Sequence, residues 1–241
     1  MVTYMLYWVV ESEEVHAKVS KLGLDIVLFG ENKYEQTNIS QYIRSIKLNR
    51  DKIPSFSQYP FCLPAICNLF DLNLDPKVTF IVGENGTGKS TILEAIAVAY
   101  GFNPEGRAKN FNFASSDTHS ELHEFVRLIK GAKTPKDAFF LQAESFYNLA
   151  TNIDELEREV PGLVSSYGGR SLHKLSHGES FFSVFMNRFR GKGLYILDEP
   201  EAALSPSRQM SMITRMHELV EQDSQFIIAT HSPIIMAYPL L

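Results

Sequence analysis

The chain has 241 residues, of which 44% are hydrophobic and 21% charged, a balance typical of a globular protein with one large core. Its formal net charge of −5 excludes a broad basic field that holds nucleic acid through the phosphates, although a local basic patch stays open. Cys62 and Cys67 are too few for a disulfide framework and lack zinc-finger histidines, so we interpret them as reduced packing residues.

The start of the chain contains an apolar run at residues 2–10, which is far shorter than the roughly 20 residues that span a bilayer. It also lacks the basic region and cleavage site of a secretion signal. We therefore expect a cytoplasmic protein without direct membrane insertion. Residues 1–40, with one strand-like run at 25–29, form an N-terminal extension to which we assign no role.

From residue 43 onward, strand-like and helix-like segments alternate. Strands are predicted at residues 43–48, 69–74, 77–82, 137–141, 194–197 and 225–229, and helices at 91–100, 119–130, near 179–190 and near 206–222. This alternation predicts an α/β fold with a largely parallel sheet. The chain shows no internal repeat and no heptad array.

A glycine-rich loop between a predicted strand and helix matches the P-loop pattern in full. We expect its residues to bind the nucleotide, namely Gly83, Glu84, Asn85, Gly86, Thr87, Gly88, Lys89, Ser90 and Thr91. The backbone N–H groups would surround the phosphates, Lys89 would reach the β- and γ-phosphates, and the Ser90 hydroxyl would bind Mg²⁺. The alternative is a glycine-rich turn that binds no ligand. It does not explain why the complete pattern lies between a predicted strand and a predicted helix.

Two acids end the apolar strand at residues 194–197. Asp198 is predicted to hold Mg²⁺, and Glu199 to polarise the attacking water as general base, as in a Walker B motif. The alternative is a solvated strand end.

Between the two motifs lie Ser176, His177, Gly178 and Glu179, and a helix-compatible segment follows them.

The order of P-loop, serine-glycine signature, Walker B pair and late histidine resembles that of ABC-type ATPases. The resemblance implies a P-loop NTPase fold over residues 41–241, with a parallel sheet flanked by helices, an antiparallel β portion and a small helical subdomain at about 103–190. It implies that Ser176 and Gly178 meet the γ-phosphate held by a second copy. It also implies that His231 contacts the γ-phosphate and orients Glu199, which with Lys89 makes the catalytic set.

Other parts of the resemblance leave alternatives open. Gln142 is similar to the Q-loop residue that touches Mg²⁺, or it is a polar strand end. His231 is otherwise a histidine packed against the sheet. Residues 201–205 lie where the family's D-loop links two active sites, and Ser205 with Pro206 also forms a helix start.

The signature departs from the family pattern at His177 and Glu179, and the effect of His177 on phosphate binding is undecided. His173 and His177 have spacing compatible with metal ligands but are interpreted as structural. Two aromatic residues, Tyr59 and Phe61, are open candidates for an adenine contact. A small cluster, interpreted as a solvated loop or alternatively as a nucleic-acid or nucleotide contact, contains Arg107, Lys109, Phe111 and Phe113.

Residues 45–50, 101–106, 165–172 and 196–205 resemble a small stand-alone family of bacterial predicted ATPases related to SMC-like and DNA-repair ATPases. This resemblance implies a homodimer with ATP and Mg²⁺ at the interface, which couples hydrolysis to a conformational change in an unknown protein or nucleic-acid partner. The alternatives are the ATPase subunit of an ABC transporter and a switch that binds ATP without hydrolysis. Because the chain ends soon after His231, a further C-terminal part is also expected.

Overall fold

The computed structural model describes the backbone of residues 15–19 and 25–29, and it describes residues 41–102, 120–143, 167, 169, 173 and 175–238. The predicted basic and aromatic cluster at Arg107, Lys109, Phe111 and Phe113 lies outside these residues. So does most of the predicted helical subdomain at residues 103–190 that precedes Leu175.

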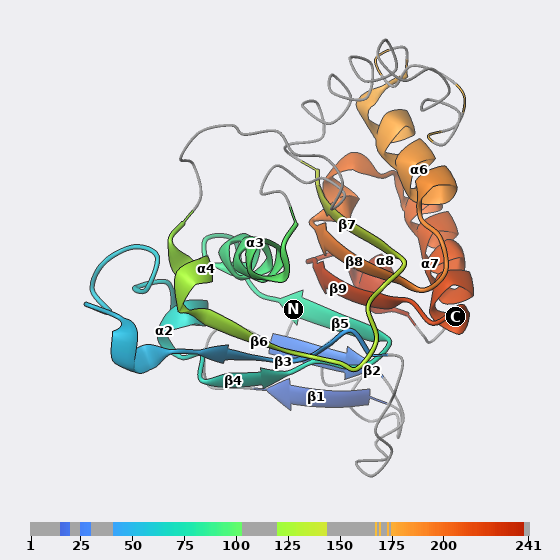
Figure 1. The fold of residues 1–241 in the computed structure, drawn as a ribbon. Coiled ribbons are helices and arrows are strands. Elements are labelled where there is room, and N and C mark those ends of the chain that lie inside the picture. Colours follow the sequence, from blue (N-terminus) through green and yellow to red (C-terminus); the bar gives the residue numbers. More distant parts are fainter. Residues whose placement is uncertain are drawn as a thin grey trace.

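The main sheet contains strands from the whole length of the chain (Figure 1). Its order is β1 (Val15–Val19), β2 (Asp25–Phe29), β5 (Val78–Val82), β9 (Gln225–Ala229), β8 (Gly193–Asp198) and β7 (Asp137–Gln142). The strands β5, β9, β8 and β7 run parallel, while β1 and β2 continue the sheet with antiparallel pairs. The α/β fold is confirmed, and the carboxyl ends of the parallel strands meet at one edge, where open α/β sheets bind their ligands.

A second, smaller sheet is antiparallel and has the order β4 (Asp71–Asn73), β3 (Ile43–Leu48) and β6 (Val126–Lys130). The prediction of one helix over residues 119–130 is wrong. The structure has a single helical turn, α4 (Leu122–Phe125), and then β6, which pairs with β3 along its length. The spaced apolar residues fit a helix, but pairing with β3 buries Leu128 and Ile129 partly in a sheet, and this tertiary contact overrides the helical pattern.

Helices cover both faces of the main sheet (Figure 1). The described helices besides α4 are α2 (Pro64–Cys67), α3 (Lys89–Tyr100), α6 (His177–Arg188), α7 (Pro206–Glu221) and α8 (Pro233–Met236), and the short 3₁₀ turns are η1 (Arg50–Lys52) and η4 (Pro200–Ala203). One apolar core lies between the sheet and α6, α7 and α8. The other core lies between the sheet, α3 and the antiparallel sheet. Among the described helices, none has the length and apolar character needed to cross a membrane.

The two apolar cores follow from the alternation of side chains along the strands. In β8, Tyr195 and Leu197 point into the core with α6 and α7, whereas Leu194 and Ile196 point into the core with α3. All six residues of β8 are buried. A strand buried on both faces reads as a continuous apolar run, which is why this strand was predictable from sequence.

Candidate nucleotide-binding site

The P-loop connects the carboxyl end of β5 to the first turn of α3. Gly86 and Gly88 have φ values of 79° and 104°, a left-handed backbone that strains residues with a Cβ. A Cβ at Gly88 would also lie 3.2 Å from the Leu63 Cβ. The loop is therefore held against the segment that carries α2, whose Ala65 N–H donates to the Thr87 carbonyl at 3.1 Å.

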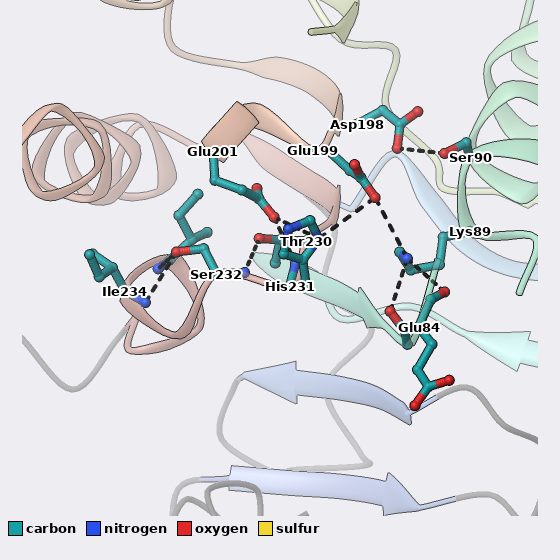
Figure 2. A network of polar contacts seen from close by, with 12 residues as sticks. Glu84, Lys89, Ser90, Asp198, Glu199, Glu201, Thr230, His231, Ser232 and Ile234 are labelled. Atoms are coloured by element: carbon teal, nitrogen blue, oxygen red, sulfur yellow. Dashed lines mark hydrogen bonds and ion pairs between the residues drawn. The ribbon is translucent and has the colours of Figure 1, made fainter. Parts of the chain in front are cut away.

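Lys89 is the first residue of α3, and only 3% of its side chain is exposed. Its Nζ donates to the Gly83 and Glu84 carbonyls at 2.9 and 3.1 Å, and lies 3.6 Å from Glu199 Oε1 (Figure 2). The ammonium thus lies over the loop that would hold phosphates and faces the second Walker B acid. This arrangement favours an anion in the loop, because a phosphate would give the buried cation a better partner than neutral carbonyls.

Three oxygen- or amide-bearing side chains meet at the carboxyl ends of β7 and β8. The Ser90 hydroxyl donates to Asp198 Oδ1 at 3.1 Å, and Gln142 Nε2 donates to Asp198 Oδ2 at 3.5 Å. Gln142 and Asp198 are also paired in register on the adjacent parallel strands. The structure therefore brings together Ser90, Gln142 and Asp198, the three residues predicted to associate with the metal, beside the P-loop.

Glu199 and His231 also lie close together, although they are far apart in the chain. Glu199 has a left-handed backbone, with φ at 46°, and its N–H donates to the carbonyl of Ala229 at the end of β9. His231 Nδ1 lies 3.7 Å from Glu199 Oε1 and 3.4 Å from Glu201 Oε1 (Figure 2). The turn after β8 and the segment after β9 thus bring the second Walker B acid and the late histidine to the same space as Lys89.

The signature residues form the amino terminus of α6, away from these contacts. Ser176 is its N-cap, and the Ser176 hydroxyl and the Glu179 carboxylate complete a capping box. The Ser176 hydroxyl and backbone N–H hold the pKa of the exposed Glu179 carboxyl below its usual range. Glu179 also lies 3.6 Å from Arg208 of α7. The departure from glutamine at Glu179 therefore has a local explanation as a helix cap.

Gly178 packs closely against η4, the turn that follows Walker B. A Cβ at this position would collide with the carbonyl oxygen of Ala203. Glycine is needed here because of this close approach, and the signature contacts the predicted D-loop segment of its own chain.

A cavity of about 400 Å³ lies at the P-loop and has the size of a small-molecule site. Its lining includes Leu63, Asn85, Lys89, Ser90, Thr91 and Glu199, together with Tyr59. Of the two candidate adenine contacts, Tyr59 is 64% exposed at this cavity, whereas Phe61 is buried with its ring against Phe125 at 4.9 Å. The structure places only Tyr59 where a bound base could reach it.

The described residues include no group of three or more His, Cys, Asp or Glu side chains arranged to hold a metal ion. His173 and His177 thus form no such group there. A P-loop metal site differs in kind, because Mg²⁺ takes few protein ligands and is completed by phosphates and water. The Ser90 hydroxyl and Asp198 carboxylate are oxygen donors that fit this chemistry.

A P-loop at the carboxyl end of β5 and two acids at the carboxyl end of β8, two strands of one parallel sheet, define the site of a P-loop ATPase. Residues 60–140 match an AAA domain model, and residues 117–236 match an AAA ATPase domain model. The chain thus contains a P-loop domain of the AAA/ABC ATPase type.

The relatives of the chain agree with this class. A protein named as an ABC transporter ATP-binding protein of Caldanaerobacter subterraneus subsp. tengcongensis is 26% identical over 191 residues, which cover 71% of this chain and 77% of that protein. An ABC transporter ATP-binding/permease protein of Mycobacterium tuberculosis is 25% identical over 64% of this chain and 19% of its own length. Structural maintenance of chromosomes protein 5 of Schizosaccharomyces pombe is 34% identical over 35% of this chain and 6% of its own length.

Sequence reasoning missed two residues that contact the predicted site. Arg208 approaches Glu179, and nothing local in the sequence of α7 marks it for that contact. Glu201 was assigned only to the D-loop segment, yet its carboxylate reaches the backbone and the ring of His231. One sequence feature could have drawn attention to Glu201: it is a third acid that follows two residues after the second Walker B acid, Glu199.

Proposed function

We propose that this chain hydrolyses Mg²⁺-bound ATP as a homodimer that holds ATP between its two copies, and that hydrolysis opens the dimer and moves an attached partner. The observation that carries the proposal is the convergence of Lys89, Ser90 and Glu199 on one cavity, with Asp198 accepting a hydrogen bond from the Ser90 hydroxyl. These residues come from the end of β8 and the start of α3, and they supply one cation, one hydroxyl and two carboxylates.

Each side chain has a role that its position supports. Lys89 would leave the Gly83 and Glu84 carbonyls and bind the β- and γ-phosphates. Ser90 and Asp198 would hold Mg²⁺, with Gln142 beside them, and bound Mg²⁺ would neutralise charge on the phosphate oxygens.

Glu199 would accept a proton from the attacking water as the water adds to the γ-phosphorus. Its side chain is 28% exposed and so can meet water. His231, 3.7 Å away and half exposed, would contact the γ-phosphate and orient Glu199.

The dimer is supported by the exposed signature at the amino terminus of α6. Ser176 and His177 are exposed, and the terminus of this 12-residue helix attracts negative charge. A second copy related by a two-fold axis would bring this terminus to the γ-phosphate held by the first, in a self-complementary interface. ATP would then join the two copies, and loss of the γ-phosphate would release them.

Mixing two inactive variants tests this arrangement. Lys89→Ala removes phosphate binding, whereas Ser176→Asp keeps an oxygen that accepts from the Glu179 N–H, loses the hydrogen bond to the Glu179 carboxylate, and places a negative charge where the second copy's phosphate would dock. Each variant alone is expected to have little turnover, while the mixture regains it, because one composite site combines an intact P-loop with an intact signature. Ser211→Asp, an added charge at an exposed position of α7, is the matched control and should keep wild-type turnover.

Two results would contradict the proposal. If the mixture stays as inactive as its components, the signature does not act on a second copy's nucleotide. If Lys89→Ala hydrolyses ATP at the wild-type rate, the assigned site is wrong. Binding of ATP without turnover by the wild-type chain would favour the nucleotide switch.

A second candidate, the ATPase subunit of a transporter, is favoured by a relative that matches 71% of this chain and is named as an ABC transporter ATP-binding protein. In that case, a membrane-spanning partner should co-purify with the chain from detergent-solubilised membranes. The ATP chemistry proposed above is common to both candidates.

A further inference from the structure

Glu201 lies in the first turn of η4, directly after the Walker B acids, and its side chain is only 7% exposed. Burying a carboxylate is unfavourable unless charged or hydrogen-bonding partners compensate for the lost water. One oxygen, Oε2, is buried without a hydrogen-bond partner in the described part of the chain. The protein therefore keeps an acid in a place where folding alone would favour a neutral residue.

The other oxygen of Glu201 makes two contacts with His231. Oε1 accepts a hydrogen bond from the His231 backbone N–H at 2.7 Å and lies 3.4 Å from the ring Nδ1 (Figure 2). A hydrogen at Nδ1 would satisfy this oxygen and leave Nε2 for a ligand, as for histidines that a carboxylate orients. Glu201 thus contacts both the main chain and the imidazole of the late histidine.

The contacts around His231 leave the orientation of its ring to Glu201 and Glu199. The flanking residues are fixed by other bonds, because the Ser232 N–H donates to Thr230 Oγ1 at 3.0 Å and the Ser232 hydroxyl donates to Gln209 Oε1 at 2.6 Å. Both flanking residues are buried. The imidazole itself is 52% exposed and lies between the carboxylates of Glu199 and Glu201. The backbone is therefore anchored on both sides, while the direction of the ring depends on these acids.

We propose that Glu201 is a positioning residue, whose buried carboxylate holds His231 so that its ring and Glu199 meet the phosphate end of ATP in a fixed relation. The proposal rests on the function assigned to His231 and Glu199 above. Glu201 is not among the residues that line the P-loop cavity, so it acts through His231. It differs from Glu199, which faces the cavity directly.

A double-mutant comparison of Glu201→Ala and His231→Ala tests the proposal in the full chain. Each single variant should lower kcat about tenfold or more, within the range of an acid–base group, while the Kd for ATP changes less than about threefold. The double variant should be no slower than His231→Ala alone, because the two residues act as one unit. Glu201→Gln, which keeps an oxygen acceptor for the His231 N–H, should restore part of the loss.

Glu221→Gln is the matched control, since it neutralises a glutamate of α7 that is 60% exposed. It should leave kcat unchanged. If the losses of Glu201→Ala and His231→Ala multiply in the double variant, Glu201 acts independently and the proposal is overturned. A weaker ATP affinity at unchanged kcat in Glu201→Ala would overturn it as well.

A second measurement separates failure of this proposal from failure of the proposed function. The ¹⁵N chemical shifts of the His231 ring in the nucleotide-free protein report which nitrogen carries hydrogen, without any need for turnover. Glu201→Gln should change the Nδ1 shift of His231, whereas Glu221→Gln should not. Unchanged ring shifts in Glu201→Gln would overturn the positioning role even if the chain hydrolyses ATP.

Discussion

The two ends of the parallel sheet use polar residues in different ways. At the amino end, the contacts are short and mutually satisfied: Arg188 Nη1 donates to both carboxylate oxygens of Asp137 at 2.9 and 2.8 Å, and the Tyr195 hydroxyl donates to the same carboxylate at 3.0 Å. At the carboxyl end, Glu199 lies 3.6 Å from Lys89 and 3.7 Å from His231. The contacts at the amino end satisfy one another within the folded chain, whereas the wider spacing at the carboxyl end leaves room for a ligand.

This difference indicates that the polar residues at the amino end stabilise the fold, whereas those at the carboxyl end serve the chemistry. Asp198, Glu199 and Glu201 are three acids within four residues of the chain, and neighbouring like charges oppose folding. Functional sites commonly keep such unfavourable groups, which the rest of the fold must compensate. Substitutions at the carboxyl end should therefore remove activity without loss of stability, and those at the amino end should do the reverse.

The largest effect is expected for Asp198→Asn at the carboxyl end. It removes the proposed Mg²⁺ ligand and one of three negative charges within four residues. ATP turnover should fall by about 100-fold or more, the scale of losing a catalytic group, and the melting temperature should stay equal or rise. Turnover measured across a Mg²⁺ titration, with thermal unfolding of the same samples, checks both parts. Wild-type turnover would remove Asp198 from the mechanism.

Arg188→Met at the amino end should give the opposite result. It leaves Asp137, whose side chain is 13% exposed, without its cation, and the free energy of unfolding should fall by about 3 kcal/mol. ATP affinity should be unchanged wherever the variant is folded. The double variant Arg188→Met with Asp137→Leu removes both charges and should lose less. Urea unfolding measures these values, and an equal loss in the double variant would show that the ion pair is not the cause.

Gln225→Leu should reduce stability next most. Gln225 is fully buried, and its amide accepts from the Tyr42 and Ile43 N–H groups and donates to the Ile43 and Asp75 carbonyls, joining the two sheets. Leaving these groups unpaired should lower the free energy of unfolding by about 2 kcal/mol. Gln58→Leu, at an exposed position, is the control for denaturation in urea. A loss no larger than that of the control would refute the joining role.

Asp75→Asn should produce the smallest effect, and a pH-dependent one. Burial raises the pKa of Asp75 to about 6 from 3.8, although the Lys77 and Val78 N–H groups oppose the shift. Since the folded carboxyl holds its proton more tightly, it contributes stability below about pH 4 that is lost as the pH rises through about 6.

Asparagine keeps an oxygen acceptor but does not ionise. Asp75→Asn should therefore flatten the change in stability between about pH 4 and 6, and at neutral pH it should raise stability by about 1 kcal/mol. Unfolding curves across this range measure the difference. A variant that follows the wild-type pH dependence would show that another group titrates.

Local patterns explain what the sequence could predict. The P-loop and the Walker B acids follow continuous apolar strands, so their positions at β5 and β8 could be inferred from short segments. The helix over residues 119–130 was wrong because β6 gains its stability from pairing with β3, which is distant in the chain. The ion pair of Asp137 and Arg188, and the contact of Glu201 with His231, join segments whose spacing carries no local signal.

The most direct test of the account is ATP turnover as a function of protein concentration, for the wild-type chain and Glu199→Gln, with dimer formation followed in the same samples. The account predicts that wild-type turnover per chain rises with concentration as dimers form. It predicts that Glu199→Gln binds ATP, accumulates as a dimer and loses about 100-fold or more of its turnover. Turnover independent of concentration, or wild-type turnover in Glu199→Gln, would contradict it.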